Sequence, residues 1–521
     1  MTEIFTILFL YFVGICDSLK ILAIFPYNGR SHHIYYSALV EELANRHHDV
    51  TVINYHPVPK LPTLRQISLQ DKENASDNVN VEEHMKVLSM SDLSVAYDTA
   101  EVFKRIANEN CEKLVKNREV QELIKSGSHF DLVIVEQFVT DCGLAVAYKV
   151  NAPAVGMTAH ILMPWTYSRL GAPNNPAYVP NHFFGSRLRP NLFNKIKSAI
   201  INFGMNLYYT HVIQRSDQEI VNEAYPDTPL LEDLGKNMSL IMINQYFPLT
   251  SPRLYSVNVV EVGGMHIKGN DLQHFLDTAN NGVVYISFGS VASNFPPRIA
   301  NEIIQFIEKS NVRFVWKTDV TDWVQPSNVF LGKWMPQAAV LCHPKVVAFI
   351  SHAGMLSTSE ATHCGVPIIG VPLFGDQFAN AQSAVESGLG VAVDILSLSE
   401  RVLEDALKTV LKEKYQRKAK ELSRVWKDRP LSPMDTTIFW IEYVARNKGT
   451  INMKPPTVDL PLYQYLMIDV VFVIGSILIL MLFIVFKVVS VVIKYSSGKK
   501  SVRLFIAVSG QICTIPTCSA M

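Results

Sequence analysis

Residues 347–360 read VAFISHAGMLSTSE, and this stretch decides how the chain folds. Four apolar residues lead to Ser351, as in a buried strand of a parallel sheet. Small residues follow, and a helix is expected from Gly354. A strand that passes through a tight turn into a helix is the building unit of α/β proteins. The stretch therefore predicts one strand–turn–helix unit, with polar side chains at the carboxyl end of the strand.

The same unit recurs on both sides of this stretch. Residues 367–372 (PIIGVP) follow it as a further short strand, and residues 282–288 (GVVYISF) begin the series to which it belongs. Nearer the N-terminus, residues 19–25 (LKILAIF) and 132–135 (LVIV) indicate an earlier series. We therefore expect an α/β protein with two doubly wound, Rossmann-like domains and a cleft between them. Because ligands of such sheets bind at the carboxyl ends of the strands, the chemistry should face that cleft.

The composition excludes several classes of protein. The chain has 521 residues, and its 47 Lys and Arg residues balance 47 Asp and Glu residues, whereas nucleic-acid-binding proteins carry a basic excess. No G-x-G-x-x-G motif follows a strand, which argues against a nicotinamide-dependent oxidoreductase. The seven cysteines form no C-x-x-C pair, so a zinc or thioredoxin-like site has no support. We expect them to be mostly free, buried thiols.

Two apolar segments indicate the compartment. Residues 4–15 have the length of a signal-peptide core, and we expect a signal peptide over residues 1–18. Residues 470–486 carry no charge and predict a transmembrane helix over 466–487. Lysines follow this helix, so the positive-inside rule places a tail of residues 488–521 in the cytosol. The body is then lumenal.

The chemistry gathers at the carboxyl ends of the second series of strands. The helix after Ser351 offers free backbone N–H groups to a phosphate, and His352 can donate to the same anion. Trp334 offers a flat face to a base. Gln337 and Glu360 can hydrogen-bond a base edge or ribose hydroxyls. Together these residues describe a nucleotide-sugar site.

The run from Trp334 through Gln377 resembles the signature of the UDP-glycosyltransferase family, GT-B enzymes that glycosylate small molecules, and its details are most similar to invertebrate members. The resemblance covers the whole expected lumenal chain and the anchor. It implies that Trp334 stacks on uracil, Gln337 contacts the uridine and Glu360 binds the ribose. It further implies a set of residues for the diphosphate and the donor sugar: His352, Gly354 and Ser357 with Ser287, Gly289 and Ser290 for the diphosphate, and Asp376 with Gln377 for the sugar.

One position departs from the family pattern. The family has two glycines after the histidine, and here the first is Ala353. If that position needs a positive φ, alanine costs roughly 1 kcal/mol relative to glycine.

A histidine is the expected base for the acceptor hydroxyl, because its ordinary pKa lies near neutrality. His32 lies after the first strand, where the family places its catalytic histidine; His33 is the alternative, although it should point elsewhere on a helix. A carboxylate should orient this base. Glu136 holds the aligned position at the end of the strand 132–135, whereas Asp141 is of the expected type but lies later. We favour Asp141 narrowly.

Other expectations are negative or general. No D-x-D motif occurs, which agrees with a mechanism that needs neither a metal nor another cofactor. His47 and His48 follow the first helix and are expected at the surface. Five residues are plausible apolar linings of an acceptor pocket: Met157, Phe183, Phe184, Tyr208 and Tyr209.

By the resemblance, the chain divides as follows: signal peptide 1–18, N-terminal acceptor-binding domain 19–250, C-terminal UDP-sugar-binding domain 251–450, linker 451–465, transmembrane helix 466–487 and cytosolic tail 488–521. The expected activity is inverting transfer of a hexose, glucose first, from a UDP-sugar to a hydroxyl of a small lipophilic acceptor, in detoxification or metabolite conjugation. The expected place is the endoplasmic reticulum membrane, as a single-pass type I protein with glycosylation acceptors at Asn74 and Asn237. A non-catalytic binding protein is the alternative, and the oligomeric state stays open.

Overall fold

Thirteen strands in two parallel sheets occur among the residues that the structure, a computed structural model, describes. These residues are 18–70, 85–86, 88, 92–179, 181–183, 191–267, 276, 279, 281–289, 295–318, 326–450 and 453–509. The expected signal peptide lies outside them, apart from residue 18.

The first sheet has the strand order β3-β2-β1-β4-β5-β6-β7, and its neighbours pair in parallel. Its strands are β1 (Lys20–Ile24), β2 (Asp49–Asn54), β3 (Leu64–Ser68), β4 (Leu132–Glu136), β5 (Ala154–Thr158), β6 (Ile241–Ile243) and β7 (Val259–Glu261). Strand β1 has β2 on one side and β4 on the other, with Ala23 opposite Ile134. The chain thus reverses its winding direction between β1 and β4.

The second sheet repeats this plan in the order β10-β9-β8-β11-β12-β13. Its strands are β8 (Val283–Ser287), β9 (Arg313–Lys317), β10 (Val329–Gly332), β11 (Val346–Ser351), β12 (Ile368–Gly370) and β13 (Gly390–Ala392). The winding reverses between β8 and β11, where Ser287 lies opposite Ser351 at the carboxyl ends of both strands.

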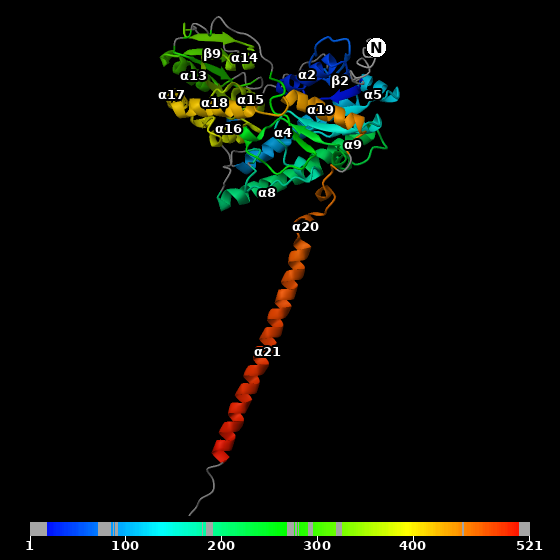
Figure 1. The fold of residues 1–521 in the computed structure, drawn as a ribbon, viewed down its shortest axis with the longest axis vertical. Coiled ribbons are helices and arrows are strands. Elements are labelled where there is room, and N and C mark those ends of the chain that lie inside the picture. The colour runs from blue at the N-terminus through cyan, green and yellow to red at the C-terminus, as the bar shows by residue number, and fades with distance from the viewer. Residues whose placement is uncertain are drawn as a thin grey trace, which may run out of the picture. The chain divides into compact units, whose positions relative to one another are not determined.

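Helices connect the strands, and Figure 1 shows them around the two sheets. Those of the first half are α2 (Arg30–Asn45), α4 (Asp92–Val115), α5 (Arg118–Lys125), α6 (Cys142–Lys149), α7 (Thr166–Arg169), α8 (Leu192–Tyr208), the π-helix η1 (Tyr209–Ile213), α9 (Gln214–Ala224), α10 (Leu231–Lys236) and α11 (Phe247–Thr250). Those of the second half are α13 (Pro297–Lys309), α14 (Gln337–Leu341), α15 (Met355–Cys364), α16 (Gln377–Glu386), η2 (Ile395–Ser397), α17 (Glu400–Val410), α18 (Glu413–Lys427) and α19 (Pro433–Arg446). Since helices cover both faces, the strands are continuous apolar runs.

The division between the halves differs from the expected boundary at residue 250. Strand β7 pairs with β6, so the first sheet continues to Glu261. Helix α19 also returns to the first half, because Ile438 and Ile441 share a buried cluster with Ile21 of β1. The halves are therefore joined by two crossings of the chain and form one compact unit that ends at Val458.

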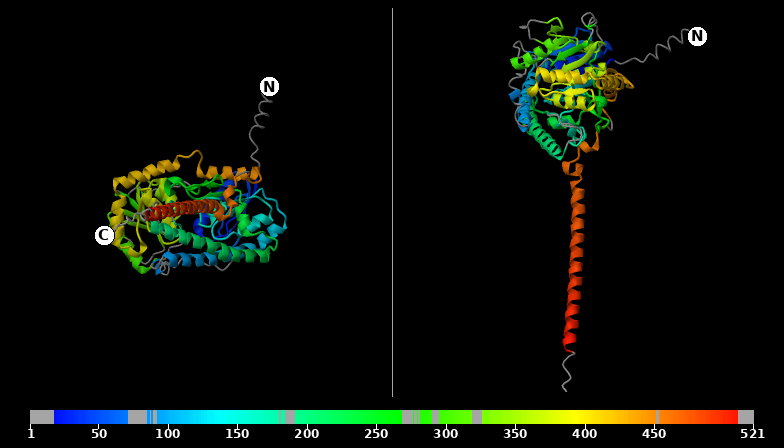
Figure 2. Two further views of the ribbon diagram at one scale, coloured as in Figure 1. Left: turned by 90° about the horizontal axis from the view of Figure 1, so that it is seen from below. Right: turned by 90° about the vertical axis from the view of Figure 1, so that its left-hand side faces the viewer.

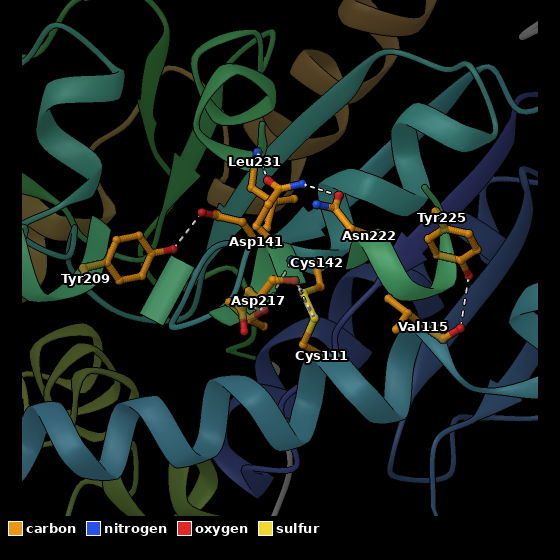
Figure 3. The surroundings of a disulfide bond; sticks show 11 residues. Cys111, Val115, Asp141, Cys142, Tyr209, Asp217, Asn222, Tyr225 and Leu231 are labelled. Carbon is orange, nitrogen blue, oxygen red and sulfur yellow. Dashed lines mark hydrogen bonds between the residues drawn. A yellow bond between two sulfur atoms is a disulfide. The ribbon is translucent and has the colours of Figure 1, made fainter. Parts of the chain in front are cut away.

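The expectation of free thiols is wrong for the described cysteines. Cys111 of α4 is bonded to Cys142 of α6, and Cys342 is bonded to Cys364 of α15. Figure 3 shows the first of these disulfides beneath the buried residues around Asp141. The partners lie 31 and 22 positions apart, so their proximity depends on the fold and has no local signal.

Residues Asp459–Met521 form a second compact unit. It contains the short α20 (Leu462–Tyr465) and α21 (Ile468–Ser509), which Figure 2 shows as one uninterrupted helix. Residues Ile468–Ser496 are long and apolar enough to cross a membrane. The helix thus extends well beyond the expected end at residue 487.

Candidate active site

The two reversals of winding place the candidate site residues. In open α/β sheets, the crevice for a ligand opens at the carboxyl ends of the strands where the order reverses. In the first sheet, His32 follows β1 and Glu136 ends β4. In the second sheet, Ser287 ends β8 and His352 follows β11. The residues expected from the sequence thus come from the two points where the topology favours a site.

His32 lies in the first turn of α2, and its Nδ1 is 2.5 Å from Oε1 of Glu136. The other carboxylate oxygen of Glu136 accepts the backbone N–H of Tyr27 at 3.3 Å. Glu136 is buried, whereas His32 is partly accessible. Because an ionised carboxylate can only accept hydrogen bonds, Nδ1 carries the proton and the lone pair is on Nε2.

Asp141, the favoured partner of His32, is not in contact with it. Its two oxygens accept a bidentate pair of hydrogen bonds from Arg169, at 2.9 and 2.7 Å. Tyr209 donates at 2.7 Å, as Figure 3 shows, and Gln214 donates at 2.9 Å. This carboxylate is buried and its charge is compensated, so the structure corrects the assignment in favour of Glu136.

Aromatic side chains that the sequence reasoning missed surround His32. Ring centroids of Tyr27, Phe138 and His160 lie 4.7, 5.0 and 5.6 Å from that of His32. Burial lowers the pKa of His160 well below its ordinary value, and its Nδ1 donates to the carbonyl of Ile161 at 2.6 Å. His32, the candidate base, therefore lies among aromatic rings and a neutral histidine.

The other histidines in or near α2 differ from His32 in their contacts and their burial. His33 packs on His56, with ring centroids 5.0 Å apart, and burial lowers its pKa to about 4. His47 is exposed, as expected. His48 is buried, contrary to expectation: its Nδ1 accepts the backbone N–H of Leu19, and its Nε2 lies 3.5 Å from Glu442 of α19. It connects the start of β1 to the returning helix.

The turn after β11 is built closely around His352. A Cβ on Gly354 would lie 2.5 Å from Nε2 of His352, and a Cβ on Gly289 would lie 2.8 Å from it. A side chain at either position would force the buried ring of His352 to move. Ala353 has a φ of 60°, a backbone conformation that favours glycine. The expected loss of stability from alanine at this position therefore applies.

Lys317, at the end of β9, is a cation beside the turn that carries His352. The sequence analysis did not predict it. Its Nζ donates to the carbonyl of Gly289 at 3.0 Å. Burial, with a contribution from this cation, lowers the pKa of His352 to about 4. His352 is therefore neutral at physiological pH, and the positive charge beside the N-terminus of α15 is that of Lys317.

The expected uridine residues form a connected network. Gln337 donates to Oγ of Ser357 at 2.9 Å and to Oε2 of Glu360 at 2.6 Å. Oε1 of Glu360 lies 3.2 Å from Nε2 of His266, a buried residue of the first half. The network holds Glu360 where the two halves meet.

Trp334 is 49% exposed, which suits a stacking platform. The guanidinium of Arg30 lies 4.2 Å from the centroid of its ring, and Nζ of Lys317 lies 4.5 Å from it. Because Arg30 begins α2, two positions before His32, the ring lies next to the residues around the candidate base.

Asp376 lies close enough to the first half of the chain for the charge of His32 to act on its carboxyl. Burial raises the pKa of its carboxyl, and the Asn380 amide and the charge of His32 offset part of that rise. Asn380 donates to it at 2.9 Å. Gln377 is buried, and its side-chain oxygen accepts the backbone N–H groups of residues 373 and 374. The amide of Gln377 thus shapes the loop that presents Asp376.

Two expected residues, Ser290 and Phe184, lie outside the described residues. The remaining proposed linings divide: Met157 belongs to the core beneath β1, Tyr209 to the Asp141 network, and Phe183 packs on His182. Tyr208 donates to Glu101 at the surface.

Two parallel sheets of Rossmann type, with the candidate base on one and the nucleotide signature on the other, make up the GT-B fold. A crystal structure described as the glycotransferase of kitacinnamycin aligns with a TM-score of 0.56 at 17% identity, over 81% of this chain and 98% of that one. A structure described as LpCGTa in complex with UDP aligns with a TM-score of 0.53 at 17% identity, over 82% and 100%.

The family model "UDP-glucoronosyl and UDP-glucosyl transferase" matches residues 20–502. The chain is 33% identical to UDP-glycosyltransferase UGT5 of Dactylopius coccus, over 93% of this chain and 94% of the relative. It is 32% identical to UDP-glucosyltransferase 2 of the same insect (89% and 91%) and 29% identical to human UDP-glucuronosyltransferase 1A10 (94% and 94%). The chain belongs to this family and is a UDP-glycosyltransferase.

Proposed function

We propose that the protein transfers a hexose, glucose first, from a UDP-sugar to a hydroxyl of a small lipophilic acceptor, with inversion at the anomeric carbon. The observation that carries this proposal is the His32–Glu136 pair, because it supplies an oriented base among apolar rings and beside Asp376.

His32 acts through Nε2, since Nδ1 is held by Glu136. Nε2 takes the proton of the acceptor hydroxyl while the oxygen forms a bond to the anomeric carbon. The bond between that carbon and the diphosphate oxygen breaks, and UDP leaves with the electron pair. Glu136 offsets the positive charge that develops on the imidazole, as in the serine-protease triad.

The donor is held by the second half. Trp334 stacks on uracil, Gln337 and Glu360 bind the uridine, and Asp376 with Gln377 binds the sugar. The diphosphate lies at the N-terminus of α15, with these partners: Ser287, Gly289, Ser290, His352, Gly354 and Ser357. The helix N-terminus and the charge of Lys317 stabilise the leaving UDP, so the mechanism needs neither a metal nor another cofactor.

We place the body in the lumen of the endoplasmic reticulum, with α21 as a type I membrane anchor. The two disulfides support this placement, because they form in oxidising compartments. Asn237 is exposed and is open to glycosylation. The proposed role is conjugation of lipophilic metabolites and foreign compounds for detoxification. Glucose is preferred because one relative is named a UDP-glucosyltransferase, while the human relative is a UDP-glucuronosyltransferase.

A donor panel with several phenols tests the proposal. The full-length protein in detergent should transfer glucose faster than glucuronate, and His32→Ala should lower turnover by about 10³ or more while UDP binding stays nearly intact. Transfer from no donor, with UDP still bound, would favour a non-catalytic binding protein. Turnover of His32→Ala within about tenfold of the parent, which is about 1.4 kcal/mol of barrier, would exclude His32 as the base.

A further inference from the structure

His266 is a buried histidine of the first half that belongs neither to the candidate base nor to the donor residues expected from the sequence. It ends the turn of residues 263–266 after β7, and only 7% of its surface is exposed. Within the part of the chain that the structure describes, neither nitrogen of its ring makes a well-aligned hydrogen bond. Because buried polar groups are almost always paired, a buried ring with two such nitrogens points to a functional role.

The turn that carries His266 is fixed by hydrogen bonds to the end of β6. The backbone N–H of Val262 donates to the carbonyl of Ile243 at 2.9 Å, and that of Gly263 donates to the carbonyl of Gln245 at 3.0 Å. A Cβ on Gly263 would lie 2.7 Å from the backbone of Gln245, so a side chain there would push the turn away. The position of the ring is therefore set by the backbone of the first sheet.

The ring of His266 lies against a carboxylate of the second half. Its Nε2 is 3.2 Å from Oε1 of Glu360 in α15, and Gln337 donates to the other oxygen, Oε2, at 2.6 Å. Since an ionised carboxylate only accepts hydrogen bonds, Nε2 carries a proton toward Glu360. The two side chains thus approach the carboxylate at its two oxygens and restrict its rotation.

This arrangement leaves acceptor capacity on Glu360 for a pair of hydroxyls. A carboxylate has about four lone-pair positions, two on each oxygen. Gln337 and His266 each take one, on different oxygens, so one remains on each oxygen. The neighbouring 2′ and 3′ hydroxyls of a ribose are two donors that can reach these two positions together.

His266 also packs against the helix of the candidate base. The ring centroid of Tyr35 in α2 lies 5.7 Å from that of His266. Tyr35 follows His32 by three positions, and residues three apart are neighbours on the surface of a helix. Helix α2, His266 and Glu360 thus form one packed series from the base to the carboxylate of the second half.

We propose that His266 is a positioning residue for the donor, which holds the carboxylate of Glu360 in the plane that accepts both ribose hydroxyls. This inference rests on the proposed role of Glu360 in binding the ribose. His266 acts through Glu360, so its loss weakens the recognition of the ribose and leaves the chemical step intact. The first half then contributes to the donor site, although the sequence signature lies wholly in the second half.

Nucleotide affinities of the full-length protein in detergent test the proposal. Calorimetry compares UDP with 2′,3′-dideoxy-UDP, which lacks both ribose hydroxyls, and the parent should prefer UDP by about 10². His266→Met and His266→Gln have nearly the same shape, but only Gln can donate to Glu360. We expect His266→Met to reduce the preference about tenfold through weaker UDP binding, and His266→Gln to retain most of it. The KM for the UDP-sugar should rise about tenfold in His266→Met, with kcat nearly unchanged.

His48→Met is the matched control. His48 is also buried and lies 3.5 Å from a carboxylate, that of Glu442, away from the donor residues. Its replacement should lower stability and leave the preference for UDP unchanged. Thermal unfolding verifies the fold of each variant. His266→Phe, which keeps a flat ring against Tyr35, takes the place of His266→Met if that chain fails to fold.

Full preference for UDP in the His266→Met chain, or equal weakening of both nucleotides, would overturn the proposal, since the ring would then be structural. Glu360→Gln separates this failure from a failure of the proposed function. Loss of the preference in Glu360→Gln, with its retention in His266→Met, would remove only the role of His266. An unchanged preference in Glu360→Gln would remove ribose binding by Glu360 from the proposed function, and this inference with it. In the double variant the two effects should not add, because His266 acts through Glu360.

Discussion

The end of β4 and the start of α6 each present a buried carboxylate, and the two have different surroundings. Glu136 lies against the ring of His32, accepts the backbone N–H of Tyr27 and has the phenol of Tyr36 beside it. Asp141 is held by a guanidinium, a phenol and an amide. Both are almost fully buried, so burial does not distinguish them. The side chain opposite each carboxylate does distinguish them. A carboxylate opposite a histidine ring can balance a positive charge that appears on the ring during turnover. A carboxylate opposite a permanent cation has its charge already balanced.

Glu136→Gln should have the largest effect in this comparison. The amide keeps the shape and can accept the Nδ1 proton, but it cannot offset the charge on protonated His32. We expect turnover to fall by about 10²–10⁴, measured at saturating donor and acceptor. Thermal unfolding should change little, because Gln still fills the site.

The control for this variant is Glu136→Asp, which keeps the charge at a shorter reach and should recover part of the lost turnover. Nearly normal turnover of Glu136→Gln would show that the pair is structural, and a dead Asp141→Asn enzyme with intact folding would reverse the assignment.

Asp141→Asn should act on stability. The change leaves the buried guanidinium of Arg169 without its bidentate partner, and breaking a buried pair costs about 3–5 kcal/mol. Glu232 also contacts Arg169 at 2.8 Å, so we expect the lower end of that range. The urea midpoint should fall, while turnover per folded molecule stays within about tenfold of the parent. Glu232→Gln is the control and should cost about 1 kcal/mol or less, because Glu232 is partly exposed.

The sequence predicted most of the strands, because continuous apolar runs such as 19–25 and 282–288 are strong local signals. The donor residues lie close together in the chain and carry a specific signature, so the sequence could propose them as one set, and their roles stay a prediction. Long-range partners escaped prediction. The choice between Glu136 and Asp141 depends on Arg169, Tyr209 and Gln214, which come from three later helices and carry no local mark.

Other differences have the same cause. The return of α19 to the first sheet and the burial of His48 both depend on a contact across almost the whole chain. Lys317 and His266 reach the donor network from the end of a strand and from a loop, where a lone cation or histidine is usually a surface or core residue. Their positions in the structure, not their residue types, place them beside the candidate donor residues.

Removal of the Cys111–Cys142 disulfide sharpens the same comparison, because Cys142 begins α6 directly after Asp141. The double variant Cys111→Ser, Cys142→Ser frees a loop of 31 residues and should lower the free energy of unfolding by about 3 kcal/mol. Turnover at low temperature should persist, since Glu136 and His32 are positioned by β4 and α2. A loss of turnover in the folded variant would show that the start of α6 controls the base after all.

The matched variant is Cys342→Ser, Cys364→Ser, which should destabilise the protein similarly and raise the donor KM, because Cys364 ends α15.

Asp217 offers the smallest and most selective test, since it is a buried carboxylate next to Asp141 and no cation pairs with it among the residues that the structure describes. Thr140 donates to Oδ2 at 2.7 Å, and burial raises the pKa of Asp217 to about 8 from its ordinary value near 3.8, with the charge of Asp141 adding to the rise. A group whose pKa is higher in the folded state contributes stability that is fully present below about pH 4 and is lost as the pH rises through 8.

Asp217→Asn removes this titration and keeps the shape of the side chain. The variant should therefore gain stability relative to the parent as the pH rises from 5 to 8, by about 1 kcal/mol per pH unit. Urea unfolding of both chains across this pH range measures the difference, with Asp233→Asn at the surface of α10 as the control whose difference should stay flat. A flat difference for Asp217→Asn would mean that this carboxylate is ionised in the folded protein and has a partner after all, so that it would resemble Asp141.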